Sequence, residues 1–180
     1  MIVSERQVKL FGVKKVAERE WYRQNRLREP FIKNFNRVMT NYYRNLANEI
    51  NETWKTGSIF LISLDMNRNQ KTLQNIFRVQ YTVIANAFKN YALDRMQNVK
   101  DFDSDFDRKL NLYIEENVGT MVTDINETTR NRIQSVINSG YNDGLSTEQT
   151  GNALRNTILG FGAYRANLIA RTETHRTASW

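Results

Sequence analysis

Apolar side chains recur every three or four residues along most of this chain, which is the spacing of one face of an α-helix. The first clear run, from Phe31 to Trp54, predicts a long amphipathic helix that ends near Gly57. A second run predicts a helix over residues 69–98, and a third predicts a helix that starts near Ser104. The apolar positions are Phe31, Phe35, Val38, Tyr42, Leu46, Ile50 and Trp54 in the first run; Leu73, Ile76, Phe77, Val83, Ile84, Ala87, Phe88, Tyr91 and Met96 in the second; and Phe106, Leu110, Ile114, Val118, Met121, Val122, Ile125, Ile133, Val136 and Ile137 in the third.

The segments before and between these runs lack that period or contain a chain breaker. Residues 1–13 mix apolar and charged side chains, so we expect an extended arm or a short pairing segment. Residues 14–29 are strong helix formers, and Pro30 is expected to end their helix and begin the next one. The apolar, β-branched stretch 58–64 is expected to be a buried connector or a short strand. The chain therefore divides into a basic N-terminal arm and helix (1–29), a long helical hairpin (30–100) and a C-terminal region (101–180).

The C-terminal region carries clear signals for where helices stop and start. Gly144 is a helix stop, and Ser146 followed by Gln149 forms a capping box for the next helix. Gly160 and Gly162 are expected to divide the rest of the chain into two short helices. The predicted fold is all-α: an elongated bundle of long antiparallel helices with two short helices at the C-terminus.

Composition limits the class of protein and the kinds of site. Of the 180 residues, 40% are apolar, which excludes wholesale disorder, and no cysteine is present for disulfides or thiolate metal sites. No stretch is apolar enough to cross a membrane, so no membrane partner is expected. The net charge of +7 is uneven: residues 1–58 hold twelve Lys/Arg and six Asp/Glu, whereas residues 101–127 hold two and eight. A basic N-terminal third favours DNA, RNA or an acidic protein surface as a partner.

The sequence presents no catalytic or metal-binding constellation, and we expect neither an enzyme nor a cofactor. His175 is the only histidine, and its nearest carboxylate, Glu173, is two residues away on a different side of a helix. The alternate acids from Asp101 to Asp107 resemble the start of a calcium loop, but Phe106 stands where that loop needs glycine. A solvated turn before a helix is the preferred interpretation.

The most specific pattern in the chain lies near its C-terminus. Gly144-Leu145-Ser146 precedes a helical segment, and Arg165-Ala166 is followed in phase by Ile169-Ala170-Arg171-Thr172-Glu173-Thr174 and by Thr177-Ala178. This pattern resembles the C-terminal hallmark of the minor head (head morphogenesis) proteins of tailed bacteriophages, a family named for a phage Mu protein. Residues 118–140 resemble the helix that precedes it, so the resemblance covers the last third of the chain. Family members usually continue into a region that often holds paired cysteines, so we expect a short member or part of a longer protein.

That resemblance implies a structural minor capsid protein of the virion, located inside the capsid or at the portal vertex and in the host cytoplasm during assembly. It implies contact with the portal protein or the major capsid protein, and with double-stranded DNA during packaging. Two alternatives stay open: a sequence-independent DNA-binding virion protein, and the targeting half of a longer enzyme fusion. The aromatic stripe from Phe31 to Trp54 exceeds what many monomers bury and favours a homo-oligomer.

Two groups of residues are candidates for function. The motif residues are Gly144, Ser146, Arg165, Ala166, Ile169, Ala170, Arg171, Thr172, Glu173 and Thr174. We expect Arg165 and Arg171 to pair with Glu173 or Glu127 and so to fix the last helix, with direct partner contact as the alternative. The second group is the candidate DNA or portal contact: Lys14, Lys15, Arg19, Trp21, Arg23, Arg26 and Arg28. These cations suit phosphates or an acidic capsid or portal surface; the alternative is a solvated helix face with Trp21 in the core.

Overall fold

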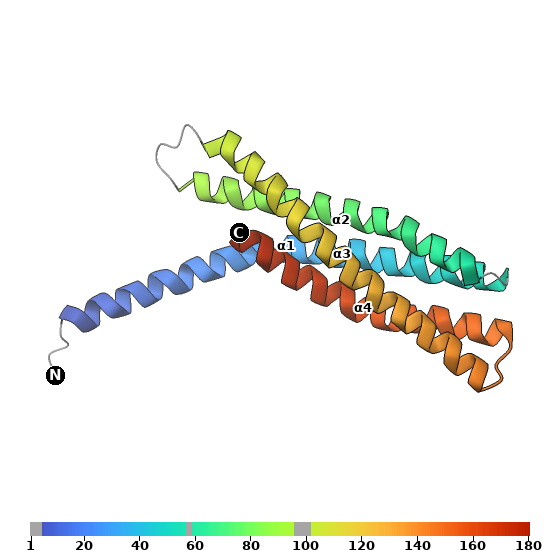
Figure 1. The fold of residues 1–180 in the computed structure, drawn as a ribbon. Coiled ribbons are helices and arrows are strands. Elements are labelled where there is room, and N and C mark those ends of the chain that lie inside the picture. Colours follow the sequence, from blue (N-terminus) through green and yellow to red (C-terminus); the bar gives the residue numbers. More distant parts are fainter. Residues whose placement is uncertain (1–4, 57–58, 96–101) are drawn as a thin grey trace.

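A computed structural model describes the backbone of residues 5–56, 59–95 and 102–180 and, outside 5–15, 59–67 and 102–104, their side chains. The described residues form α1 (Glu5–Lys55), α2 (Ile59–Leu93), α3 (Phe102–Asn142) and α4 (Thr147–Ser179), with no strand among them. Successive helices run in opposite directions (Figure 1). The prediction of an all-α bundle of long antiparallel helices is confirmed.

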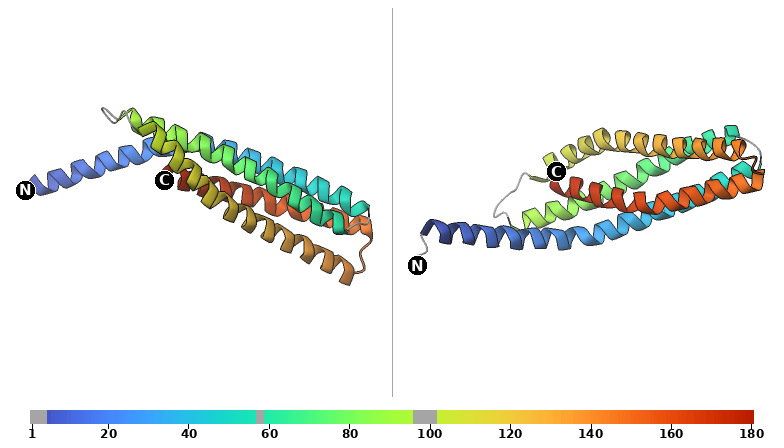
Figure 2. Two further views of the ribbon diagram at one scale, coloured as in Figure 1. Left: turned by 45° about the horizontal axis from the view of Figure 1, so that its top comes forward. Right: turned by 90° about the horizontal axis from the view of Figure 1, so that it is seen from below.

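The helices do not all touch one another. α4 packs on α1, α2 and α3, and its contact with α1 is the most extensive in the bundle. α2 also packs on all three others, whereas no described Cα atom of α1 lies within 8 Å of one in α3. α1 and α3 are therefore the far pair of the bundle, with α2 and α4 between them. The N-terminal part of α1 extends beyond the other helices (Figure 2).

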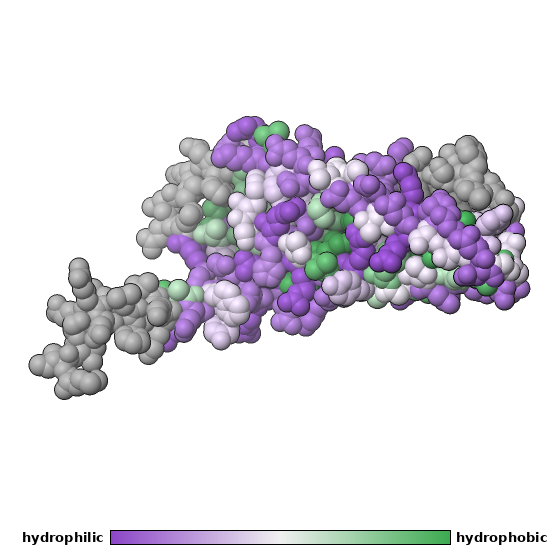
Figure 3. Space-filling model, turned by 60° about the horizontal axis from the view of Figure 1, so that its bottom comes forward, coloured by the Kyte–Doolittle hydropathy of each residue, from purple (hydrophilic) through white to green (hydrophobic). Residues whose placement is uncertain are grey.

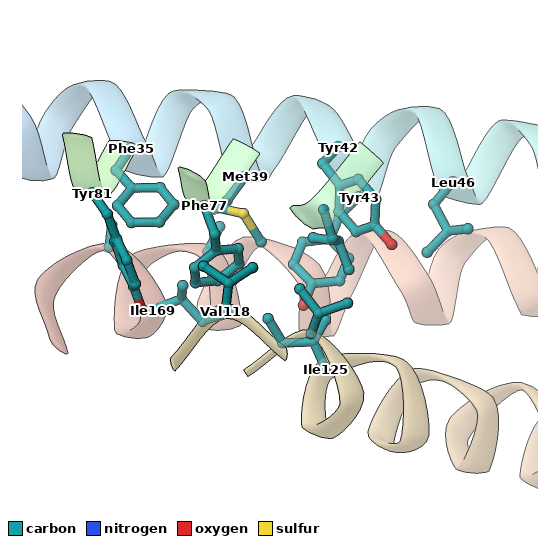
Figure 4. Packing of buried hydrophobic residues seen from close by; sticks show 14 of the residues in the cluster. Phe35, Met39, Tyr42, Tyr43, Leu46, Phe77, Tyr81, Val118, Ile125 and Ile169 are labelled. Carbon is teal, nitrogen blue, oxygen red and sulfur yellow. The ribbon is translucent and has the colours of Figure 1, made fainter. Parts of the chain in front are cut away.

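The inner face of α1 supplies a large part of the core. Phe35, Met39, Tyr43, Leu46 and Ile50 each have at most 1% exposure. Figure 4 shows the α1 side chains pointing toward residues of the other three helices. Burying one such side chain stabilises the fold by about 1.5–3 kcal/mol. Of the predicted stripe, Phe35, Tyr42, Leu46 and Ile50 are buried, whereas Phe31, Val38 and Trp54 are partly buried. A single chain therefore covers most of the stripe, and the stripe itself does not require a second copy.

Two predicted breaks in α1 are wrong. The helix begins at Glu5, so residues 5–13 are helical rather than extended. Pro30 lies inside the helix, and the expected boundary between 1–29 and 30–100 falls within one element. Proline lacks the N–H that would donate to the carbonyl four residues earlier, and its ring crowds that carbonyl. Core contacts of Phe31 and Phe35 directly afterwards offset this penalty, and α1 changes direction where it meets the bundle (Figure 1).

The predicted limits of α2 and α3 also need correction. Residues 59–64 are helical rather than a connector or strand, while 57–58 lie outside the described residues. β-Branched residues have only a weak preference for strands, and the long helix that follows overrides it here. α2 ends at Leu93, before the predicted end at residue 98, and α3 begins at Phe102, before the expected turn ends.

α4 is one helix of 33 residues, so the predicted division into two short C-terminal helices is wrong. Gly160 and Gly162 both lie within it. Gly162 is buried, and a Cβ atom built on it would stand 2.6 Å from Cβ of Tyr43 in α1. A glycine inside a helix costs about 0.5–1 kcal/mol relative to alanine. The close approach of α4 to α1 offsets that cost and explains why glycine does not end the helix here.

Candidate functional site

The turn before α4 forms as the sequence predicts. The Leu145 N–H donates to the Gly140 carbonyl at 2.9 Å, closing the end of α3. Gly144 has a φ of +66°, a left-handed conformation that glycine adopts without strain. Ser146 Oγ accepts from the Gln149 N–H at 3.2 Å, and Gln149 Oε1 accepts from the Ser146 N–H at 2.8 Å. The predicted stop and capping box are both confirmed.

The motif residues of α4 divide between the core and the surface. Ala166, Ile169, Ala170, Glu173 and Thr174 are buried, Arg171 and Thr172 are exposed, and Arg165 is half-buried. Gly162, Ala166 and Ala170 recur every four residues and form one narrow buried face. Small side chains on this face let the backbone of α4 lie close to its neighbours.

Glu173 is the buried charge of the motif, with 1% exposure. Its Oε2 accepts a hydrogen bond from the Tyr81 hydroxyl of α2 at 2.5 Å and lies 3.6 Å from Nη1 of Arg176. Burial, together with the carboxylate of Glu173, raises the pKa of Tyr81 far above its usual value. A buried carboxylate is strongly destabilising unless it has partners. The pair therefore fixes α4 against α2, which is a structural role for the acidic residue of the motif.

Arg165 and Arg171 do not form the ion pairs predicted for them. Among the described residues, neither pairs with Glu173 or with the exposed Glu127 of α3. Glu173 faces α2, whereas Arg171, two residues earlier, faces solvent, because residues two apart on a helix point in different directions. Arg165 instead influences the titration of Tyr43. Burial raises the pKa of Tyr43 to about 12, and the positive charge of the Arg165 guanidinium limits that increase.

The outer side of α4 presents a shallow hollow of about 520 Å³. It is lined by Tyr164, Asn167, Leu168, Arg171, Thr172 and His175. Burial, with the nearby guanidinium groups of Arg28 and Arg171, lowers the pKa of His175. These neighbours favour a neutral imidazole and suit contact with a polar or anionic surface.

Exposed cations follow the outer side of α1. Arg19, Arg23 and Arg26 lie on one face because they are four and three residues apart, and Arg37 and Arg44 continue that face. We call these five residues the α1 basic face. It extends for about 37 Å at 1.5 Å per residue. Within the described residues none of the five is in an ion pair, whereas Lys33 nearby is paired with Glu29.

Arg28, predicted as a partner contact, is instead part of the packing. Its side chain is buried, and its guanidinium lies 5.5 Å from the ring centre of Phe88 in α2. It also donates to the side-chain oxygens of Gln24 and Asn25, each at 3.4 Å. This position does not fit a contact with DNA or with a portal. Arg28 was grouped with the exposed arginines by sequence proximity, although it lies on the other side of α1.

The two aromatic residues of the basic segment are both at the surface. Trp21 is 57% and Tyr22 is 63% exposed, and their rings meet edge to face at 5.0 Å. The alternative that placed Trp21 in the core is therefore wrong. Lys14 and Lys15 lie on α1, but their side chains are outside the described residues.

The opposite charge gathers on α3. Glu115, Glu116, Asp124 and Glu127 are exposed, and within the described part of the chain none of them forms an ion pair. We call these four residues the α3 acidic face. Asp105, nearer the start of α3, differs because Arg108 and Lys109 pair with it at 2.6 Å each and lower the pKa of its carboxyl.

Comparison of the chain with protein-family models, with curated proteins and with solved structures finds no match. The helices that the structure describes include none with the length and hydropathy of a membrane span. In the same part of the chain, no three His, Asp or Glu side chains lie close enough together to hold a metal ion.

Sequence reasoning missed an aromatic cluster at one end of the bundle. Trp180 packs against Phe106 and Tyr113, with ring centres 5.6 and 5.1 Å apart. An open cavity of about 1020 Å³ lies beside them, and Lys89 and Arg95 are among its lining residues. Phe106 and Tyr113 lie in the first part of α3 and Trp180 directly follows α4, so no local pattern joins them.

The arrangement offers charged surfaces on a rigid helical frame. Figure 3 shows that one face of the molecule is mostly hydrophilic, with small, separate apolar areas. Cations dominate the outer side of α1, and carboxylates dominate the middle of α3. Such a molecule is suited to binding through charge rather than through a continuous apolar patch.

Proposed function

We propose that this chain is a structural minor head protein of a tailed phage, a non-enzymatic adaptor between the portal or capsid interior and the packaged DNA. The observation that supports this best is the motif from Gly144 to Thr174, in sequence and in structure. Its turn is capped as the pattern requires, and its helix, α4, is packed on every other helix of the bundle. In this proposal the motif holds the frame, and the frame presents the contact surfaces.

The polar residues of the motif support a structural role rather than a catalytic one. Glu173 is engaged with Tyr81 and Arg176, and Ser146 is engaged as a helix cap. A general base needs access to a substrate proton, and a carboxylate with 1% exposure does not have it. The exposed Arg171 and Thr172, by contrast, are free to contact a partner surface.

The α1 basic face is the proposed contact for DNA or for an acidic portal or capsid surface. Three of its members, Arg19, Arg23 and Arg26, were predicted for this role, and all three are exposed. Regularly spaced cations on one side of a helix can follow a phosphate backbone without reading its sequence. The same row of cations also supports a second candidate function, a sequence-independent DNA-binding virion protein whose main task is to bind the genome.

Co-purification with the portal protein of the same phage tests the proposal. The complex should be captured at about 50 mM salt and again at about 500 mM salt, where exposed charge pairs are largely screened. The proposal expects a stoichiometric complex at low salt. A complex that persists at high salt would add apolar helix faces to the contact.

Charge reversal then identifies the surface. R19E/R23E/R26E should weaken capture of the portal protein or of duplex DNA at least tenfold. The matched control, K71E/R78E/R132E, changes the net charge equally at exposed positions on α2 and α3 and should leave capture unchanged. Absence of portal binding, with salt-sensitive binding of duplex DNA, would overturn the adaptor proposal and support the genome-binding candidate.

A further inference from the structure

The two charged faces of the molecule lie on the two helices that are farthest apart. α2 and α4 separate α1 from α3, and no described Cα atom of α1 lies within 8 Å of one in α3. The α1 basic face points outward, because the opposite side of the helix carries Phe35, Met39 and Tyr43 into the core. The α3 acidic face is also solvent-exposed. Within one chain the two faces therefore cannot meet.

The α3 acidic face has a shape that a helix can approach. Gly119, Thr120 and Thr123 lie between Glu115 and Glu116 on one side and Asp124 and Glu127 on the other, and all are exposed. A Cβ atom built on Gly119 would meet no other atom within 4 Å. Thr123 donates its hydroxyl proton to the carbonyl of Gly119, so it presents its methyl group without a free donor. The surface between the carboxylates therefore carries only small side chains and leaves room for an approaching helix.

Three arginines of the α1 basic face are complementary to this surface in charge and fit within its length. Arg19, Arg23 and Arg26 span two helical turns, about 10 Å, and the carboxylates from Glu116 to Glu127 span about 16 Å. Tyr22 lies beside the arginines and is 63% exposed, so it adds apolar surface to the same side. The cations lack ion-pair partners in the described chain, and so do the carboxylates.

We propose that the occupant of the α3 acidic face is a second copy of this chain, which docks through Arg19, Arg23 and Arg26 of its α1. Each copy carries both halves of the contact, so two copies can pair reciprocally or further copies can add in a row. One helix crossing another buries little area, at the low end for specific interfaces. The association is therefore weak, rises with concentration and depends on salt. A second copy can dock in this way whether or not the chain binds a portal.

Sedimentation velocity of the purified, nuclease-treated full chain tests this with no portal or DNA present. The average mass should rise with concentration at about 50 mM salt and return to that of the monomer at about 500 mM salt. R19E/R23E/R26E should abolish association, and E116K/D124K/E127K should also abolish it. K71E/R78E/R132E, with the same change in net charge as the first variant, should associate as the unmodified chain does.

Mixing the two inactive variants is the decisive step. In an equimolar mixture, the basic α1 of the second variant can meet the acidic α3 of the first, and the reversed faces can also meet. Association should therefore return in the mixture, to about twice the monomer mass. A monomer in all conditions would overturn the proposal. The proposal would also be overturned if R19E/R23E/R26E lost association while E116K/D124K/E127K kept it, because that result would mean that the contact does not involve the α3 acidic face. Circular dichroism of each variant confirms that it is folded.

Discussion

At the scale of single residues, two glycines in the same helix have opposite roles. Gly162 faces Tyr43 at a distance that leaves no room for a methyl group, whereas Gly160 is exposed with no atom near its Cβ position. We expect G162A to destabilise the protein by about 1–3 kcal/mol, because α4 must move away from α1. G160A should stabilise it by about 0.5–1 kcal/mol through better helix propensity.

Urea unfolding of both variants measures the difference directly. G160A serves as the matched control, since it adds the same methyl group to the same helix. Equal stabilisation by both substitutions would show that α1 and α4 are not in close contact at Gly162.

The hydrogen bond between Tyr81 and Glu173 should contribute measurably to stability. Y81F removes the hydroxyl that donates to a carboxylate with 1% exposure. Leaving that carboxylate without its closest partner should lower the free energy of unfolding by about 1–3 kcal/mol. Y141F, at a tyrosine with 86% exposure, should change it by less than about 0.5 kcal/mol. An unchanged urea midpoint for Y81F would show that the pair does not fix α4 against α2.

Residue roles were predictable where they depend on neighbours in the sequence. The turn at Gly144 and the cap at Ser146 involve only residues that are close in sequence, so the spacing of these residues was sufficient to predict both. The partner of Glu173 is 92 residues away, and nothing in the sequence singles out Tyr81. Arg28 and Arg26 are both arginines of one helix, and only the packing of α2 determines which is buried.

At the scale of elements, helical periodicity identified the long helices but overestimated the breaks. Pro30, residues 58–64 and the Gly160/Gly162 pair all carry local signals against a helix, yet each lies within one wherever the structure describes it. Local penalties of a few kcal/mol at most are smaller than the burial of several core side chains on either side. The side chains that pack against these segments come from other helices, so a short stretch of sequence does not reveal them.

Pro30 interrupts the backbone hydrogen bonding of α1. It is exposed, and alanine in its place restores a backbone hydrogen bond and relieves the ring's clash. We expect P30A to raise the free energy of unfolding by about 1–3 kcal/mol. R37A, also exposed on α1, should change it by less than about 0.5 kcal/mol. A loss of stability in P30A would mean that the change of direction in α1 is needed for the packing of Phe31.

At the scale of the whole molecule, buried tyrosines make the bundle sensitive to alkali. Burial raises the pKa of Tyr43 to about 12, and it also raises the pKa values of Tyr42 and Tyr81. An unfolded tyrosine titrates near pH 10, so the unfolded state loses these protons first. Their contribution to stability is complete below about pH 10 and is lost as the pH rises toward about 12.

Urea midpoints measured between about pH 8 and about pH 11 should therefore fall above about pH 10. The urea midpoint of Y43F should fall less steeply with pH, because one titrating group is removed. A midpoint that does not change over this range would contradict the burial of these hydroxyls.

The separation of charge between α1 and α3 also gives the molecule a permanent dipole across its width. In the field of a highly charged object, such a molecule rotates before it touches, so encounters begin with a preferred side. A polyanion would meet α1 first, and a cationic surface would meet α3 first. The on-rates of both kinds of encounter should fall as salt increases, even where the final contact is apolar. The bundle is thus oriented by long-range forces before any specific contact forms.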